Sequence, residues 1–320
     1  MSANHPLLQP ALDLFAAGRT AEGIAAVARL AEDGLAPAVR LQGEIVWNGL
    51  GGSPDPVAAR HLFERAAALG DAQAAIYATN LLASGIAGPR DWTGAIARLR
   101  AQAAADPART AVLDLVEAMA LDDVGYPTVL AQPEPVSETP RIRIYRQFFS
   151  EAECDHALQV AQGRYQPSMV YNAARQLVRD PIRTSDGATL NWLTEDPAIH
   201  ALLRRIGRAT GTDPGQGEAA QVLRYAPGQE YRPHYDYLRG TANQRIVTAL
   251  VWLNEDYAGG ETAFIRTDIK LRGRKGDAVV FWNALADGQI DPLTEHAGLP
   301  VWQGTKLLFN RWIRAARWQP

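Results

Sequence analysis

The first 120 residues repeat themselves at an offset of 36 positions, and this internal repeat limits what the chain can fold into. A repeat of this length in helix-forming sequence is typical of stacked helical hairpins. Small residues at fixed positions let paired helices approach closely, and each glycine ends a helix or turns the chain. We therefore expect helices near 6–17, 20–33, 37–49, 56–69, 72–84, 92–105 and 108–120. The matching pairs are Gly34 and Gly70, Ala38 and Ala74, Gly49 and Gly85, Asp55 and Asp91, and Ala59 and Ala95.

This repeat resembles Sel1-like repeats, which are relatives of tetratricopeptide repeats. The resemblance is carried by Ala58-Ala59, by segment 66–72 and by segment 85–91. Arrays of this kind present concave surfaces that bind peptides or proteins. Two interpretations remain open: a protein partner on the repeats, or a module that only packs against the rest of the chain.

The helical pattern stops between residues 122 and 140, where four prolines forbid a continuous helix. We expect a helical repeat domain at 1–121, a proline-rich linker at 122–140 and a second domain at 141–320. The linker is expected to be extended or to run along the surface as a strap. Its prolines are Pro127, Pro133, Pro135 and Pro140.

The second half mixes helices with many short strands. Segment 141–145 alternates and predicts a strand, and Ser150 with Glu153 forms a capping box for a helix to about 162. Another helix is expected from Thr194 or Asp196 to about 209. Strands are predicted at 222–225, 246–253, 261–265, 278–282 and 306–313, separated by glycine-rich turns. The fold class is therefore α+β multidomain, with the second domain a double-sheet jelly roll backed by helices.

Charge and cysteine content narrow the function classes. The net charge of −3 offers no overall field for nucleic acid or an anionic membrane. No run of about 20 apolar residues is present, and the N-terminal residues do not resemble a signal peptide. The single cysteine, Cys154, fits a reducing compartment. We expect a cytoplasmic protein that binds neither nucleic acid nor membrane.

Two histidines and one aspartate of the β-rich half are candidates for a metal site. His234 and Asp236 are two residues apart in an expected extended segment, so their side chains point the same way. His296 opens a late strand that can return beside them. Two imidazoles and one carboxylate are the facial ligand set of non-haem Fe(II) oxygenases.

The sequence around these residues resembles the prolyl 4-hydroxylases, which are Fe(II)/2-oxoglutarate dioxygenases with a double-stranded β-helix core. The resemblance covers about residues 141–314 and includes Arg183-Thr184-Ser185, which resembles the substrate loop of that family. It is carried by 222–236 (VLRYAPGQEYRPHYD), 245–248, 253–254, 259–262, 275–278, 281–283, 296–298, Val301, Gly304, Lys306 and 311–314.

The resemblance implies a role for each matching residue. His234, Asp236 and His296 would hold iron, and Lys306 would hold the C5 carboxylate of 2-oxoglutarate. Further residues are Tyr225 and Thr248 in the cosubstrate pocket, Trp312 near the site, and Arg183, Thr184 and Ser185 in a mobile loop that closes over the substrate. The alternation around Lys306 does not by itself say whether its side chain faces inward.

One position departs from the pattern of the family. Trp252 stands where the family often has tyrosine before Leu253-Asn254. An indole N–H donates a hydrogen bond but does not accept one. Trp252 therefore either reshapes the cosubstrate pocket or packs in the core, and we expect core packing.

The implied activity is an oxygenase reaction. Fe(II), 2-oxoglutarate and O₂ would take part, with ascorbate as reductant, and succinate and CO₂ would be released. The expected substrate is a prolyl residue in a protein or peptide. Two alternatives remain: a non-catalytic interaction module built on the repeats, and an oxygenase of a free amino acid or other small molecule.

Overall fold

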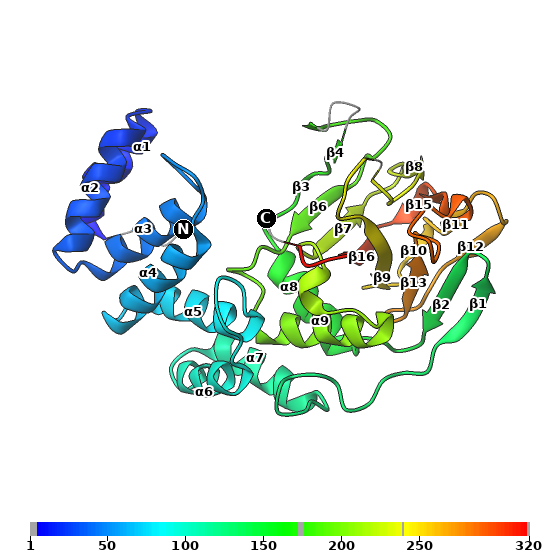
Figure 1. Cartoon of the computed structure of the whole chain (residues 1–320), viewed down its shortest axis with the longest axis horizontal. Coiled ribbons are helices and arrows are strands. Elements are labelled where there is room, and N and C mark those ends of the chain that lie inside the picture. Colours follow the sequence, from blue (N-terminus) through cyan, green and yellow to red (C-terminus); the bar gives the residue numbers. More distant parts are fainter. Residues whose placement is uncertain (1–4, 172–175, 239, 319–320) are drawn as a thin grey trace. The chain divides into compact units, whose positions relative to one another are not determined.

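The computed structural model describes residues 5–171, 176–238 and 240–318 (Figure 1). Contacts between residues divide the chain into two units. One unit comprises residues 1–114 and 192–200, and the other comprises 115–191 and 201–320. Among the described residues, no helix is both long and apolar enough to cross a bilayer.

The first unit is an array of helices at the positions that the repeat predicts. Its elements are the short 3₁₀ helix Pro6–Leu8, α1 (Gln9–Ala16), α2 (Thr20–Glu32), α3 (Ala36–Trp47), α4 (Pro56–Ala68), α5 (Ala72–Ser84), α6 (Trp92–Ala103) and α7 (Pro107–Ala118), which extends past the division. Each expected helix is confirmed, with ends that differ by a few residues.

The 36-residue offset has a physical basis in helix caps. Asp55 and Asp91 accept hydrogen bonds from the backbone N–H of Ala58 and Gly94 and so begin α4 and α6. Such caps satisfy backbone donors that the helix leaves free. Gly85 has φ +74°, and a β-carbon there would lie 2.8 Å from Arg90. The repeated aspartates and glycines therefore begin and end equivalent helices.

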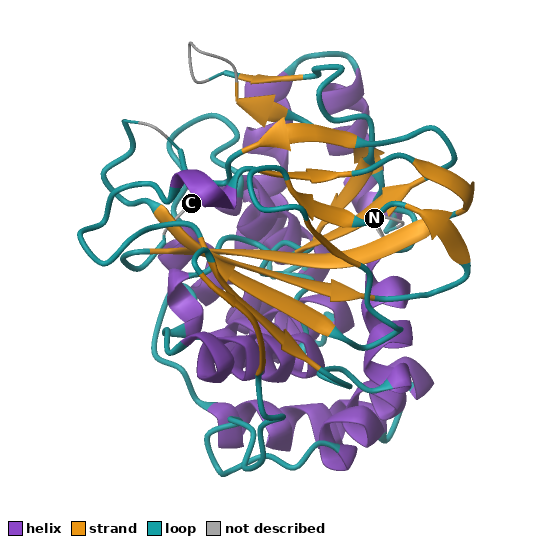
Figure 2. Ribbon diagram, turned by 90° about the vertical axis from the view of Figure 1, so that its right-hand side faces the viewer, coloured by secondary structure: helices purple, strands orange, loops and turns teal. Residues whose placement is uncertain are grey.

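The second unit is built on two sheets, as the jelly-roll prediction requires (Figure 2). The larger sheet has the order β1-β2-β13-β9-β16-β7-β6-β3, and the smaller has the order β12-β11-β14-β8. The larger sheet contains β1 (Glu134–Glu138), β2 (Arg141–Tyr145), β3 (Gln166–Pro167), β6 (Asp186–Thr189), β7 (Gln221–Tyr225), β9 (Arg245–Trp252), β13 (Ala278–Trp282) and β16 (Lys306–Arg314). The smaller contains β8 (Tyr231–His234), β11 (Thr262–Phe264), β12 (Ile269–Leu271) and β14 (His296–Gly298).

Two short strand pairs accompany these sheets. Strands β10 (Tyr257–Gly259) and β15 (Val301–Gly304) pair with one another, as do β4 (Val170–Tyr171) and β5 (Leu177–Val178). The predicted strands are confirmed, and the short strands β3, β4, β5, β6, β10, β12 and β15 are additional.

Helix α8 (Glu151–Ala161) begins with the predicted capping box of Ser150 and Glu153. Helix α9 (Pro197–Thr210) spans the division, and its second part bonds to α8 and to the segment before α8. Arg205 of α9 pairs with Glu153 at 2.6 Å, and its guanidinium also donates to the carbonyl of Phe148. Phe149, which lies just before α8, packs edge-on against Phe309 of β16. The segment that leads into α8 therefore contacts the larger sheet.

The segment expected to be a linker contains a strand. Residues 134–138 form β1, which pairs antiparallel with β2 at the edge of the larger sheet. Pro135 is tolerated because an edge strand has one side on which no ladder partner is needed. The register shifts between Pro135 and Ser137, which marks a bulge. The contact division falls after Asp114, whereas the sequence predicted a boundary after Leu121.

Candidate metal site and cosubstrate cavity

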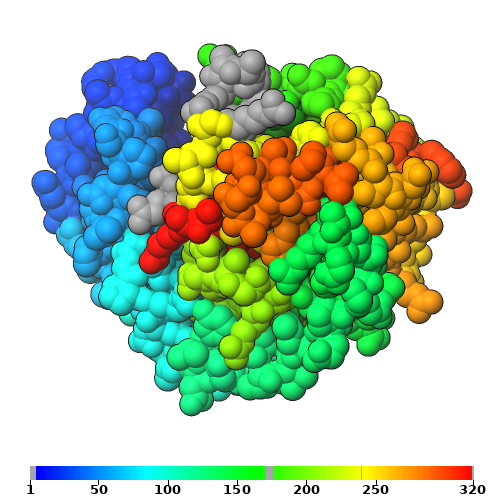
Figure 3. Space-filling model, turned by 45° about the vertical axis from the view of Figure 1, so that its right-hand side comes forward, coloured from blue at the N-terminus to red at the C-terminus, as the bar shows by residue number. Residues whose placement is uncertain are grey.

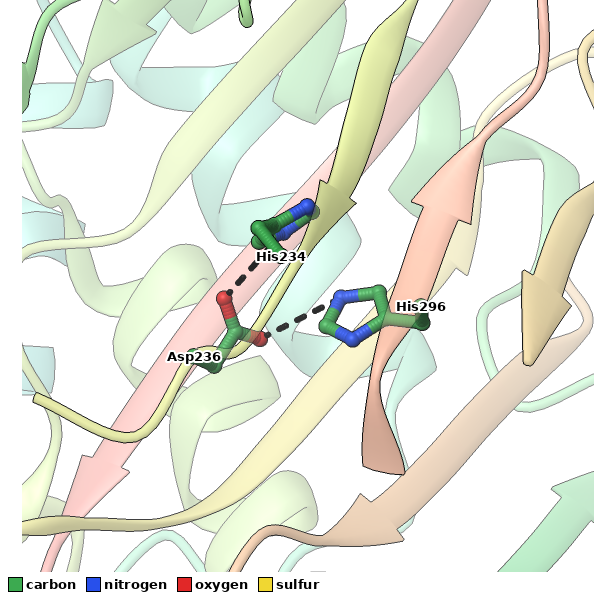
Figure 4. A group of neighbouring side chains, drawn as sticks. All are labelled: His234, Asp236 and His296. Atoms are coloured by element: carbon green, nitrogen blue, oxygen red, sulfur yellow. Dashed lines mark ion pairs between the residues drawn. The ribbon is translucent and has the colours of Figure 1, made fainter. Parts of the chain in front are cut away.

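The three candidate ligand residues come together between two paired strands (Figure 4). His234 ends β8, and His296 begins β14 directly opposite it in the ladder. Asp236 follows two residues after β8, and its carboxylate lies between the two rings. The Nε2 atoms of His234 and His296 lie 3.6 Å and 3.7 Å from the two Asp236 oxygens. One ligand atom of each residue lies within 4.8 Å of the others.

Backbone carbonyls orient both imidazoles. Nδ1 of His234 lies 2.8 Å from the carbonyl of Arg232, and Nδ1 of His296 lies 2.9 Å from the carbonyl of Thr294. A carbonyl only accepts, so each Nδ1 carries a proton, and in the neutral form of each ring Nε2 keeps a lone pair for a metal. This is the outer arrangement that usually accompanies metal-bound histidine.

The carboxylate of Asp236 is held by a buried chain of two hydrogen bonds. The Thr248 hydroxyl donates to Asp236 Oδ2 at 2.6 Å, and Asn283 Nδ2 donates to the Thr248 oxygen at 2.9 Å. Thr248 and Asn283 are fully buried. The amide supplies the hydrogen between Asn283 and Thr248, so the single hydroxyl hydrogen is directed to Asp236.

The charge states of Asp236 and His296 suit a divalent cation. Burial alone would raise the pKa of Asp236, but His296, His234 and Arg245 hold it well below its usual range. Burial and the neighbouring His234 lower the pKa of His296 to about 4. A carboxylate and neutral imidazole therefore face one point at pH 7. The donor set fits Fe(II) with open coordination positions.

Lys306 lies in the same cavity. On β16, Lys306, Leu308, Asn310 and Trp312 alternate with the other face and line the cavity together with the three ligand residues. Lys306 is 2% exposed, and its Nζ donates to the carbonyl of Gly260 at 2.5 Å. Burial lowers its pKa to about 7, while Glu261 acts in the opposite direction. The side chain that the sequence left undecided therefore faces inward, where a buried cation favours an anionic ligand.

Comparison with known proteins shows the family of this chain. A family model described as the 2OG-Fe(II) oxygenase superfamily matches residues 220–314. Prolyl 4-hydroxylase 1 of Arabidopsis thaliana is 37% identical over 203 residues, which are 57% of this chain and 72% of that protein. Prolyl 4-hydroxylase 5 of the same plant is 31% identical over 205 residues, with shares of 56% and 70%. The chain belongs to the prolyl 4-hydroxylase family.

Two solved structures are each similar to a portion of this chain. The viral collagen prolyl hydroxylase of Paramecium Bursaria Chlorella virus-1 is 29% identical, with a TM-score of 0.42, over 55% of this chain and 96% of the viral chain. A Sel1 repeat protein from Oxalobacter formigenes is 22% identical, with a TM-score of 0.31, over 37% of this chain and 49% of its own.

Two residues that the prolyl 4-hydroxylase resemblance assigns to the cosubstrate pocket have different positions. Tyr225 lines the cavity, is buried, and lies beside Lys306, with Nζ 5.4 Å from the ring centroid. Thr248 instead bonds to Asp236.

Trp252 is fully buried in a core cluster, and a β-carbon at Gly273 would collide with its ring. The expectation of core packing for Trp252 is confirmed.

Arg183 reaches the mouth of the cavity, whereas its two neighbours in the motif face elsewhere. The Arg183 guanidinium lies 5.0 Å from the Tyr231 ring and 5.7 Å from the Trp312 ring. Thr184 exchanges hydrogen bonds with Glu230, and the Ser185 hydroxyl lies 2.9 Å from that of Ser168. Motif 183–185 is thus anchored along β8. Residues 172–175, in the preceding part of the expected loop, lie outside the described residues.

Sequence reasoning missed several residues that shape the site. The Tyr231 ring stacks on His234 with centroids 3.4 Å apart. Arg245 lies 3.8 Å from the Trp312 ring and bonds twice to Glu218, which also pairs with Arg314. Strand alternation gives no signal for this stacking, because Tyr231 and His234 are three positions apart. No local pattern links Glu218 to its two arginines, because three separate segments supply them.

Two surface loops lead to the ligand residues: one follows β8 and carries Asp236, and the other precedes His296. The segment after β8 lies beside residues 284–294, and both appear at the surface in Figure 3. The hydroxyl of Tyr235 donates to the carbonyl of Pro292, and that of Tyr237 donates to the carbonyl of Gly288. These contacts link the loop that carries Asp236 to the loop that leads to His296.

Proposed function

We propose that this chain is an Fe(II)- and 2-oxoglutarate-dependent dioxygenase that hydroxylates prolyl residues in a protein or peptide. The observation that carries the proposal is the union, in one cavity, of the His234, Asp236 and His296 ligand atoms with the buried Lys306 ammonium. In the proposed reaction, one oxygen atom of O₂ enters succinate and the other enters the product. The carbon released from 2-oxoglutarate leaves as CO₂.

Several residues in and beside the cavity have a task in this reaction. Iron held by the three ligand residues supplies the oxidising chemistry when bound. Lys306 binds the far carboxylate of 2-oxoglutarate through its ammonium, with Tyr225 beside it. Leu223, Leu250 and Leu308 line the cavity and exclude water. The Thr248 hydroxyl holds the Asp236 carboxylate in place.

A second hollow at the mouth of the cavity favours a peptide substrate over a free amino acid. It has a volume of about 420 Å³ and shares Arg183, Tyr231, His234 and Trp312 with the cavity. Met169, Leu238 and Trp318 add apolar surface. Arg183 Nε is buried and has no hydrogen-bond partner among the described residues, so it is available to a carbonyl of a bound chain. Aromatic walls with a few polar donors suit an extended peptide.

The proposal also includes the reductant and the location of the protein. We propose ascorbate as the reductant and the cytoplasm as the location, the latter because the single cysteine is free and buried. The helical unit is proposed to hold a protein partner, in keeping with the concave surfaces of helical repeat arrays.

The experiment is peptide hydroxylation followed by mass spectrometry. Purified protein is supplied with Fe(II), 2-oxoglutarate, O₂ and ascorbate, and with a proline-containing peptide or its alanine-substituted match. We expect one added oxygen on proline, with one succinate per hydroxylation, and no product from the alanine peptide. His234→Ala should abolish both products. Succinate formation that no prolyl peptide stimulates would exclude the proposed substrate, and absence of 2-oxoglutarate consumption would exclude the activity.

A further inference from the structure

One buried side-chain amide in the cavity has no hydrogen-bond partner among the residues that the structure describes. Asn310 lies in the middle of β16 and is 1% exposed. Neither its Nδ2 nor its Oδ1 has a hydrogen-bond partner among the described residues. The side chain lines the cavity that also contains the ligand residues and Lys306.

Such a group is costly unless a partner arrives. Buried side-chain amides are hydrogen-bonded in the great majority of folded proteins, and an unpaired one carries its full desolvation penalty. Asn254 shows the usual arrangement, since its Nδ2 donates to the Thr305 carbonyl and its Oδ1 accepts from the Leu307 N–H. Asn310 lies among apolar cavity residues, including Leu250 and Leu308. Packing alone would be served better by leucine.

The position of Asn310 along β16 indicates which ligand can form a hydrogen bond with its amide. Lys306 and Asn310 share one face of the strand four residues apart, a backbone separation of about 13 Å. Two residues further, Trp312 pairs with Thr248, whose hydroxyl bonds to Asp236. Asn310 therefore stands between the anion site at Lys306 and the metal ligands. A dicarboxylic acid held by Lys306 at one end and directed toward the ligand residues passes in front of this amide.

We propose that Asn310 donates a hydrogen bond to the oxo-carboxylate end of 2-oxoglutarate and is a binding residue for the cosubstrate. This inference rests on the proposed function, because it takes 2-oxoglutarate as the occupant of the cavity. Lys306 then binds one end of the molecule by charge, and Asn310 recognises the other by hydrogen bonding. A mismatched acid leaves the Asn310 amide unpaired, so the residue contributes to cosubstrate selection.

The test compares Asn310→Leu and Asn310→Asp with the wild type in anaerobic protein loaded with Co(II). Dissociation constants for Co(II) alone and then for 2-oxoglutarate are measured by calorimetry, and Tm is measured without 2-oxoglutarate. We expect Asn310→Leu to weaken 2-oxoglutarate binding by about tenfold to a hundredfold, the usual range for a hydrogen bond to a charged group. Asn310→Asp should weaken it further by repulsion between carboxylates.

The same experiment separates a ligand role from a structural one. Asn310→Leu should leave Co(II) affinity unchanged and leave Tm equal or higher, because it removes an unpaired amide from an apolar site. Asn254→Leu is the matched control and should lower Tm, since its amide is bonded on both sides. Should Asn310→Leu not fold, Asn310→Ala serves for the same comparison.

Two results would overturn the inference. One is wild-type 2-oxoglutarate affinity in Asn310→Leu, which would mean that water or another group is the partner. The other is a loss of Tm and Co(II) affinity in parallel, which would make the residue structural. Failure of the wild type itself to bind 2-oxoglutarate would instead count against the proposed function.

Discussion

Replacing Lys306 with methionine should stabilise the protein without its cosubstrate and abolish tight 2-oxoglutarate binding. Lys306 is 2% exposed, and its ammonium bonds to the Gly260 carbonyl. Its pKa falls from 10.5 to about 7 on burial. The difference of about 3.5 units corresponds to roughly 5 kcal/mol that opposes the charged form in the fold. Methionine fills a similar volume and removes the cost of burying the ammonium group.

The sign of the pH dependence follows from the direction of this shift. Between about pH 7 and 10.5 the unfolded chain holds a proton on Lys306 that the folded chain has released. Stability of the wild type therefore rises with pH across this window, and the penalty is complete below about pH 7. From pH 7 to pH 9 this one group accounts for about 2 kcal/mol of the free energy of unfolding. The difference between wild type and Lys306→Met should change by that amount.

The affinity for 2-oxoglutarate should instead fall as the pH rises, whereas the stability of the protein rises. A bound carboxylate favours the ammonium form, so binding above about pH 7 takes up a proton. The dissociation constant for 2-oxoglutarate should then rise by up to about tenfold per pH unit above 7. In Lys306→Met this dependence should vanish together with most of the affinity.

Urea denaturation of metal-free protein at pH 7 and pH 9 measures how the free energy of unfolding depends on pH. Calorimetry in buffers of different ionisation enthalpy measures the proton uptake that accompanies 2-oxoglutarate binding. Lys270→Met is the matched control, because Lys270 is exposed on β12. The reasoning is refuted if Lys306→Met is destabilised equally at both pH values and still binds 2-oxoglutarate like the wild type.

Three further predictions concern other parts of the molecule. Thr248→Val keeps the shape of the side chain but removes the hydrogen bond to Asp236, so Fe(II) affinity should fall by about tenfold, and Thr248→Ser should restore it in an anaerobic titration. Cys154 is buried with its pKa raised to about 12, so iodoacetamide should modify it at pH 8 only after unfolding; rapid labelling of native protein would contradict this. Asp91→Ala removes the cap of α6 and should lower the free energy of unfolding of the helical unit by about 1 kcal/mol, whereas Asp91→Asn should recover most of the loss.

The helical N-terminal part was predictable because its signals are local. Alanine-rich runs, aspartate caps and turn glycines each act within a few residues, so helix positions followed from the sequence. Strand β1 was missed because Pro135 indicated a break, and only pairing with β2 shows that the segment is an edge strand.

The face on which Lys306 lies was not predictable for a related reason. Strand β16 is buried on both faces along most of its length, so its sequence does not alternate between apolar and polar residues. The inward direction of Lys306 depends on the pairing of β16 with β7 and β9.

The metal ligands themselves were accessible from spacing and residue type, whereas their supports were not. His234 and Asp236 are two positions apart in an extended segment, which already brings their side chains together. The link from Asn283 through Thr248 to Asp236 joins three separate segments, and only the folded sheet brings them into contact. The unpaired amide of Asn310 likewise becomes visible only when its surroundings are known.

The most direct test of the central claim is anaerobic Fe(II) binding, measured with and without 2-oxoglutarate, in the wild type and in His234→Ala, Asp236→Ala and His296→Ala. We expect one Fe(II) per chain, tighter binding of 2-oxoglutarate when iron is present, and loss of both effects in each variant while the fold is retained. Wild-type iron and 2-oxoglutarate affinities in any of the three variants would contradict it.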